Sequence, residues 1–288
     1  MVKTGMVDRL VLSFIYGTLI LLSLSVLFPI FYVVAVSLTP FEEVLRNGGF
    51  IVVPRAITWE AYRIFLTNDR IPDAYQVTFI ITVAGTLINL VLTALLAYPL
   101  SKPRLPGRKI FLLLIVFTML FNGGIIPTYL IVKATGLLNT LWAMMIPNAV
   151  SAFNLLIMKT FYENLPESLD EAAKIDGAGE VRTLVQIVLP LSMPIMATIG
   201  LFYSVGHWNE FFQAIMYVSD TAKFPLQVVL RGILSRSQSV EELSLEETMP
   251  TESLQMAAVI LTAVPIIVVY PFIQKHFTQG VLLGSIKG

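Results

Sequence analysis

The 288-residue sequence contains no cysteine, only two histidines and few charged residues, which make up 13% of the chain. Without cysteine it forms neither a disulfide nor a thiolate metal site, and two histidines argue against a structural zinc site. Its 19 basic and 19 acidic residues balance, so it has no net field that would attract nucleic acid. No segment matches the G-x-x-x-x-G-K-[ST] phosphate-binding loop, so the chain does not by itself bind ATP in that manner.

What the sequence has instead is long apolar stretches, since 56% of its residues are hydrophobic. This share is too high for a soluble domain of this length and places the chain in a bilayer. Leu10–Val36 runs for 27 residues without a charge, which exceeds the ~7–15 residues of a signal-peptide core and predicts a retained transmembrane helix. Five further charge-free stretches of suitable length are Val77–Leu100, Ile110–Val132, Gly136–Met158, Ile187–Gly206 and Ser253–Gln274. Because only a helix satisfies its own backbone in lipid, we expect an all-α polytopic membrane protein with six transmembrane helices and both termini on one side.

Basic residues in the short connections predict the side of the membrane on which each loop lies, because such residues are retained in the cytoplasm. The connection after the second predicted span carries four basic residues and no acid, namely Lys102, Arg104, Arg108 and Lys109. The connection after the third span carries only Lys133. Both termini and the loop that follows the fourth span are therefore expected in the cytoplasm.

Two longer segments are then expected outside the membrane. Leu38–Gln76 contains a short amphipathic turn around Trp59, which favours an interfacial loop with an aromatic anchor over a dedicated ligand contact. Asp220–Glu252 is expected to include a short helix over Phe224–Leu234. An acidic group in this segment is either a solvated face or a docking surface, and the sequence leaves both open. Its members are Glu241, Glu242, Glu246 and Glu247.

The least membrane-like stretch between the apolar ones is the predicted cytoplasmic loop Leu165–Pro194. Pro166 suits the first turn of a helix, with acidic residues near its positive end, and Asp176-Gly177 is expected to stop that helix. Apolar residues at helical spacing predict a second helix over Glu180–Leu189, which ends where Pro190 interrupts the pattern. The loop is therefore expected to form a helix, a glycine turn and a second helix.

The same loop carries a spaced motif of Glu171-Ala172-Ala173, then Gly177 and, after nine residues, Ile187 and Leu189-Pro190. This pattern resembles the EAA loop of permease subunits in binding-protein-dependent ABC importers. With Asp176, Ala178 and Pro194 it is similar to the carbohydrate branch, typified by the MalG subunit of the maltose importer, and the resemblance extends from about Val77 to Gln274 and into the tail. The phrase FNGGIIPTY, residues 121–129, further resembles the LplC-like subgroup, which includes a permease of an alginate importer.

The resemblance implies a type I ABC importer (MetI-like) permease fold. Residues 77–274 would form the transmembrane core around the EAA loop 165–194, residues 1–76 an N-terminal transmembrane helix with the first external segment, and residues 275–288 a cytoplasmic tail. It also implies a multi-pass protein of the cytoplasmic (inner) membrane of a bacterium. Such a chain is not itself an enzyme and moves an oligosaccharide or polysaccharide fragment, for instance of the alginate type.

The partners that the resemblance implies are a second, MalF-like permease, an ATPase dimer that binds ATP and Mg, an extracytoplasmic solute-binding protein and membrane lipid. It implies no cofactor or metal in this chain and no nucleic acid. The first helix of the loop would sit in a groove of the ATPase, so that ATPase closure moves the attached spans. The implied ATPase-coupling residues are Glu171, Ala172, Ala173, Asp176, Gly177, Ile187, Leu189 and Pro190.

Polar residues inside the predicted spans form a second set of candidates, because they should face other helices or a wet cavity rather than lipid. For single residues such as Asn89, Asn148 and His207, hydrogen bonds between helices, worth about 0.6–2 kcal/mol each, are the alternative explanation. Aromatic rings and amides suit a passage for sugars, although interfacial belting also accounts for the aromatic residues. The residues predicted to line a substrate pathway are Asn122, Asn154, Trp208, Asn209, Glu210, Phe211 and Phe212.

Helix breakers lie within or at the ends of the predicted spans. Asn122-Gly123-Gly124 and several prolines interrupt or bound the spans, either as hinges or as static kinks.

An autonomous secondary transporter should show repeated halves and a midplane ion site of acids, whereas the halves of this sequence do not match and only Glu210 is available as an intramembrane acid. An intramembrane enzyme would need a nucleophile and a base, and no H-E-x-x-H motif is present.

Overall fold

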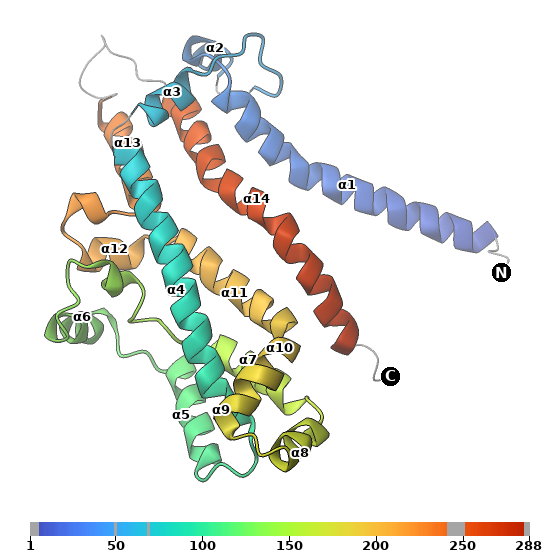
Figure 1. The fold of residues 1–288 in the computed structure, drawn as a ribbon. Coiled ribbons are helices and arrows are strands. Elements are labelled where there is room, and N and C mark those ends of the chain that lie inside the picture. Colours follow the sequence, from blue (N-terminus) through green and yellow to red (C-terminus); the bar gives the residue numbers. More distant parts are fainter. Residues whose placement is uncertain (1–5, 49–50, 68–69, 241–250, 285–288) are drawn as a thin grey trace. The chain divides into compact units, whose positions relative to one another are not determined.

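The computed structural model describes residues 6–48, 51–67, 70–240 and 251–284, and every regular element within them is a helix (Figure 1). The predicted all-α fold is therefore confirmed for the described residues. The elements in chain order are α1 (Met6–Ser37), α2 (Phe41–Arg46), α3 (Glu60–Leu66), α4 (Arg70–Ser101), α5 (Arg108–Leu120), α6 (Ile125–Ala134), η1 (Leu141–Met144), α7 (Ala152–Glu163), α8 (Glu167–Ile175), α9 (Glu180–Thr183), η2 (Leu184–Val188), α10 (Leu189–Leu191), α11 (Met193–Trp208), α12 (Phe212–Tyr217), η3 (Thr221–Lys223), α13 (Leu226–Val240) and α14 (Thr251–Gly284).

Several of these helices have the length and composition of membrane spans. Among the described residues, α1 over Arg9–Ser37 and α4 are each long and apolar enough to cross a bilayer. Two further pairs qualify if each bent pair counts as one span: α5 with α6, which meet at 117°, and Glu180–Leu191 with α11, which meet at 82°. α14 contains a shorter apolar stretch, Glu252–Val268. The chain is thus a polytopic helical protein whose predicted spans are partly bent.

The stretch Ile110–Val132 bends because of the residues at its centre. α5 ends at Leu120, and the Asn122 side-chain oxygen accepts the backbone N–H of Gly124 at 2.8 Å. Gly124 has a φ of 89°, a conformation that glycine adopts without strain. The predicted interruption at Asn122-Gly123-Gly124 is therefore present, and it turns the chain sharply.

The expectation of a helix over all of Gly136–Met158 is wrong in its first half. Gly136 and Asn139 both have positive φ, and the backbone N–H of Asn139 donates to the carbonyl oxygen of Tyr217 at 2.8 Å. The Asn139 side-chain oxygen also accepts the N–H groups of the loop at 219–220. These contacts satisfy the backbone outside a helix, and α7 begins only at Ala152.

Contacts divide the chain into two units, one of Met1–Asp69 with Leu230–Val264 and the other of Arg70–Val229 with Pro265–Gly288. In the first unit, Val36, Val44 and Ile51 form a small buried cluster. The predicted amphipathic turn near Trp59 is α3, whose inner face buries Ala61 and Phe65. The helix expected over Phe224–Leu234 is α13, while Glu241, Glu242, Glu246 and Glu247 lie outside the described residues.

The second unit is built around α4, which packs along α11 and α7 (Figure 1). Their shared core contains small and apolar side chains from α4, together with Leu155 and Met158 of α7 and Ile199 of α11. Gly85 lets α11 approach α4 closely, because a Cβ there would lie 2.5 Å from Nε2 of His207. This packing places the end of α4 beside the helices of the loop 165–194.

Candidate functional site

The loop 165–194 folds as two helical arms joined at a glycine, which we call the α8–α10 hairpin (residues 167–191). Its first arm, α8, starts after Pro166 with Glu167 and Asp170 in its first turn, where carboxylates stabilise the positive end of a helix. Ala173 is only 2% exposed and packs inward. The helix–turn–helix predicted for this loop is confirmed.

The turn between the arms has a defined backbone geometry. The N–H of Ala178 donates to the carbonyl oxygen of Ala173 at 2.8 Å, and the N–H of Gly177 donates to that of Lys174 at 3.0 Å. These two bonds are the Schellman pattern, which requires a left-handed residue after the helix. Gly177 supplies it with a φ of 71°, and a Cβ at Gly177 would meet no atom within 4 Å. Glycine is thus required here by the backbone conformation and not by lack of space.

The prediction that the second helix ends at Pro190 is wrong. The helix continues through Pro190 to Leu191, and the chain bends at Ser192. Proline lacks a backbone N–H and its ring collides with the carbonyl one turn earlier. The preceding residues Leu184–Val188 adopt a π-helix, η2, and this wider turn leaves room for the ring.

The predicted coupling residues lie on different faces of the hairpin. Glu171, Ala172, Asp176 and Pro190 are exposed, Ala173 is buried, and Ile187 and Leu189 are half-buried. Sequence reasoning missed two large apolar side chains, Ile175 and Val181, which are 86% and 76% exposed on either side of the turn. Their signal in the sequence is an apolar side chain within an otherwise polar loop.

Two polar contacts join the hairpin to the end of α4. The Lys102 ammonium forms an ion pair with Asp170 of α8. The Tyr98 hydroxyl donates to the Glu180 carboxylate of α9 at 2.8 Å. The Lys102 nitrogen also lies 4.5 Å from the centre of the Tyr98 ring, where the ring face attracts a cation. Both arms are therefore held by one helix end.

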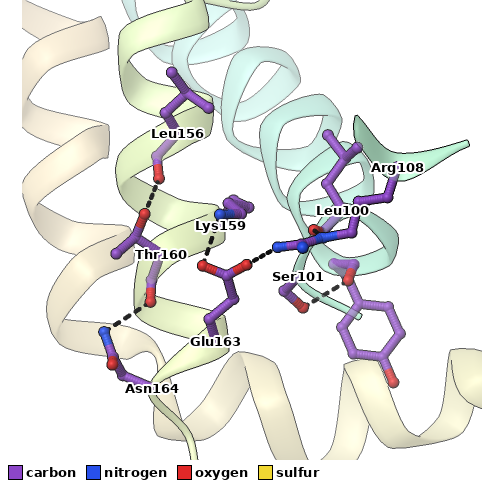
Figure 2. Close-up of polar contacts among 9 residues, drawn as sticks. Leu100, Ser101, Arg108, Leu156, Lys159, Thr160, Glu163 and Asn164 are labelled. Carbon is purple, nitrogen blue, oxygen red and sulfur yellow. Dashed lines mark hydrogen bonds and ion pairs between the residues drawn. The ribbon is translucent and has the colours of Figure 1, made fainter. Parts of the chain in front are cut away.

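Figure 2 shows a neighbouring cluster that fixes the start of α5 to α7 and α4. The Arg108 guanidinium pairs with Glu163 at the end of α7, and its Nε donates to the carbonyl oxygen of Leu100 at 2.8 Å. Lys159 approaches the same Glu163 carboxylate at 2.6 Å. The short connection between α4 and α5 is thus clamped beside the hairpin.

A second candidate region is a polar cavity of about 490 Å³ in the second unit. Its walls come from α4, α7, α11, α12 and the loops before α7 and α12. The lining residues are Asn89, Asn148, Ser151, Phe153, Asn154, Phe202, Tyr203, Gly206, His207, Glu210 and Gln213. Of the predicted pathway residues, this cavity brings together Asn154 and Glu210.

Hydrogen bonds between helices hold the cavity wall. The Asn89 amide oxygen accepts from Nε2 of His207 at 3.0 Å, while its nitrogen donates to the carbonyl oxygens of Gly85 and Ala149. The hydroxyl groups of Thr93 and Tyr203 lie 2.8 Å apart, and the Tyr203 oxygen accepts the N–H of Ser151 at 3.0 Å. These bonds explain Asn89 and His207 as interhelical contacts and connect α4 with α11 and α7.

Two amides of the cavity have unused capacity. Asn154 is 5% exposed, and its side-chain amide has no hydrogen-bond partner among the described residues. The Gln213 side-chain oxygen is also buried without a partner. Glu210, in contrast, accepts the backbone N–H of Gln213 at 2.9 Å and thereby caps the first turn of α12. The cavity can therefore offer hydrogen bonds to a polar solute.

The other predicted pathway residues lie outside this cavity. Trp208 lines a separate, largely apolar cavity beside Tyr75, and Asn122 closes the turn between α5 and α6. Asn209 binds the carbonyl oxygen of Val205 and the Gln227 amide. Phe211 and Phe212 stand at the start of α12 and do not line the polar cavity. Within the described part of the chain, no three metal-ligating side chains come together.

Comparison with known proteins places this geometry among transport proteins. A family model described as binding-protein-dependent transport system inner membrane component matches residues 110–283. The polygalacturonan/rhamnogalacturonan transport system permease protein YtcP of Bacillus subtilis (strain 168) is 44% identical over 287 residues, covering 98% of this chain and 100% of that protein. Protein LplC of the same organism is 44% identical over 263 residues, covering 90% of this chain and 89% of that protein.

A solved structure agrees with these sequence matches. A chain in the crystal structure of a bacterial ABC transporter involved in the import of the acidic polysaccharide alginate superposes with a TM-score of 0.85 and 32% sequence identity. The match covers 96% of this chain and 100% of that chain. The chain that carries this fold, hairpin and polar cavity is therefore similar to transport proteins along almost its whole length.

Proposed function

Because the chain belongs to the family of inner membrane components of binding-protein-dependent transport systems, we propose that it is one of two permease subunits of an ABC importer. In this assignment it forms half of the passage for a sugar chain and couples that passage to ATP hydrolysis on separate subunits. The chain contributes binding surfaces and mechanical coupling, and no bond-breaking step. ATP and Mg are bound by an ATPase dimer.

The observation that carries the coupling role is the apolar tip of the α8–α10 hairpin. Ile175 and Val181 are exposed, and the charged groups Asp170 and Glu180 on the same arms are turned toward α4. The free surface of the hairpin therefore offers apolar anchors beside the exposed Glu171, as expected at the centre of a protein interface. We assign this surface to the groove of the ATPase.

The substrate class follows from the cavity and from the relatives. One relative is named a polygalacturonan/rhamnogalacturonan transport system permease protein, and the structural neighbour belongs to a transporter involved in alginate import. The polar cavity supplies the amides of Asn154 and Gln213, which have free hydrogen-bonding capacity, next to Phe153 and Phe202, a combination that suits sugar hydroxyls and ring faces. The proposed substrate is an oligosaccharide or polysaccharide fragment, with Asn154 and Glu210 nearest to its path and Trp208 in the separate apolar cavity.

The remaining parts of the assembly follow from this assignment. An extracytoplasmic solute-binding protein delivers the substrate, and a MalF-like permease completes the passage. In this proposal the hairpin and both termini lie in the cytoplasm. The basic connection Lys102–Lys109 contacts the hairpin through the Lys102–Asp170 ion pair, and basic connections are retained on the cytoplasmic side. Purification of the intact complex should yield this chain with an ATPase and a second permease.

Substitutions at the hairpin tip test the coupling assignment directly. Ile175→Asp and Val181→Asp should each weaken ATPase binding, measured by co-purification, roughly thirtyfold, as for loss of an interface anchor worth about 2 kcal/mol. Val53→Asp is the matched control, because Val53 is a similarly exposed apolar residue that does not belong to the hairpin. If the hairpin variants retained the ATPase as well as Val53→Asp does, the hairpin would not be the docking site.

A further inference from the structure

The hairpin has two physical connections to the polar cavity, and they differ in stiffness. The covalent route runs along the second arm into α11, but it contains the π-helix η2 and the 82° bend at Ser192. Such irregular turns absorb changes in backbone angles. The second route passes sideways from the hairpin to α4 through Tyr98 and Lys102.

The second route contains one contact from each arm of the hairpin, so it holds the two arms together. Asp170 lies on the first arm and Glu180 on the second. They meet Lys102 and Tyr98 at the end of α4, and these two side chains are themselves in contact, because the Lys102 ammonium lies over the Tyr98 ring. The Tyr98 side chain is buried, so its hydroxyl is held within reach of Glu180. A shift of either arm is therefore transmitted to the same turn of α4.

The other end of this route lies at the polar cavity. α4 is helical from Arg70 to Ser101, and Thr93 and Asn89 precede Tyr98 by five and nine residues, or roughly 7 and 14 Å of helix. Their side chains bond Tyr203 and His207, which line the cavity. A displacement of the α4 end thus acts on two cavity-wall hydrogen bonds in α11.

We propose that Tyr98 and Lys102 are positioning residues that transmit hairpin movement along α4 to the polar cavity. This inference rests on the proposed coupling function and specifies its route. The two contacts make α4 and the hairpin move together, while η2 and the bend at Ser192 let α11 adjust to the new position. Substrate-dependent stimulation of ATP hydrolysis therefore requires the Lys102–Asp170 and Tyr98–Glu180 contacts.

Charge reversal in the reconstituted complex tests this route. Lys102→Glu and Asp170→Lys each place like charges together and should lower the ratio of stimulated to basal ATP hydrolysis roughly fivefold or more, the lower end of typical coupling between sites. The double variant Lys102→Glu/Asp170→Lys recreates an opposite pair and should restore most of the ratio. Tyr98→Phe keeps the ring and removes only the hydroxyl, so it should lower the ratio without loss of the ATPase. The probe is the complex with its own binding protein and polygalacturonate fragments, with alginate fragments in parallel.

Controls separate failure of the route from failure of the proposed function. Lys223→Glu makes the same charge change in the Lys223–Asp220 ion pair beside η3, which belongs to neither the hairpin nor α4, and should leave the ratio unchanged. A wild-type complex with no stimulated hydrolysis by any probe would count against the proposed function itself. With a stimulated wild type, an unchanged ratio in both Lys102→Glu and Tyr98→Phe would overturn the route, as would loss of the bound ATPase in all variants without rescue by the double variant.

Discussion

The backbone N–H of Ala178 donates to the carbonyl oxygen of Ala173 across Gly177, at 2.8 Å. This bond sets the direction in which α9 leaves α8, and with it the relative placement of Ile175 and Val181 at the hairpin tip. The bond needs a left-handed conformation at Gly177, whose φ is 71°. The shape of the proposed docking surface therefore depends on one backbone angle.

Gly177→Val should uncouple the hairpin while the protein remains inserted in the membrane. A left-handed conformation costs an L-residue roughly 1–2 kcal/mol, and a β-branched side chain tolerates it poorly. We expect a strong loss of stimulated ATP hydrolysis and of ATPase co-purification from the reconstituted complex. Gly179→Val is the matched control, because Gly179 has a φ of −76° and equally open surroundings. Full stimulation in Gly177→Val would show that the turn geometry does not matter for coupling.

Gly85→Ala should destabilise the contact between α4 and α11. The added Cβ would lie 2.5 Å from Nε2 of the buried His207 ring, so the ring or one helix must move at a cost of about 1–3 kcal/mol. Gly206→Ala is the control on α11, since a Cβ there meets no atom within 4 Å and alanine favours a helix by about 0.5–1 kcal/mol. Thermal unfolding of the purified chain in detergent should show a lower midpoint for Gly85→Ala alone; equal midpoints would mean that the helices are not closely packed here.

The hairpin was predictable from sequence because its signals are local. Pro166 and Gly177 each determine backbone conformation within one turn of their own position. α8 begins directly after Pro166, one residue later than predicted, and Gly177 forms the predicted turn. Pro190 shows the limit of such reasoning. A proline usually ends a helix, but the π-helix over Leu184–Val188 accommodates its ring, and the break occurs at Ser192.

The sequence carries no signal for contacts between residues that are far apart along the chain. Tyr98 and Glu180 are 82 residues apart, and Lys102 and Asp170 are 68 residues apart, so no periodicity or spacing connects them. Polarity alone also failed to separate cavity residues from capping residues. Asn154 and Glu210 both line the cavity, yet Glu210 additionally caps α12, and Asn122 serves only a turn among the described contacts.

The predicted orientation can be tested with single cysteines, since the chain contains none. Pro106→Cys lies in the basic connection after α4, and Ser219→Cys lies in the loop after α12; both positions are exposed. An impermeant thiol reagent applied to intact cells should label position 219 and spare position 106, because the basic connection is expected inside. Labelling of position 106 before permeabilisation would reverse the orientation and place the hairpin outside, away from any cytoplasmic ATPase.

Asn154→Ala should impair transport without weakening the fold. Asn154 is 5% exposed, it lines the polar cavity, and its side-chain amide makes no hydrogen bond to another described residue. Removing a buried polar group that makes no internal bond does not lose stability through hydrogen bonding and can raise it. Loss of a hydrogen bond to the passing solute should instead lower uptake, by roughly twofold to twelvefold for about 0.5–1.5 kcal/mol.

The matched control for Asn154→Ala is Asn164→Ala, which removes the same amide from the exposed end of α7. Asn164 donates to the carbonyl oxygen of Thr160 at 2.9 Å, a contact visible in Figure 2, and does not line the cavity. Uptake by proteoliposomes and thermal unfolding should be measured on the same preparations of each complex. Reduced uptake with an unchanged midpoint in Asn154→Ala alone would identify the amide as part of the passage. A lower midpoint with uptake reduced in proportion to folded protein would identify it as a packing residue, and unaltered uptake would remove the polar cavity from the substrate path.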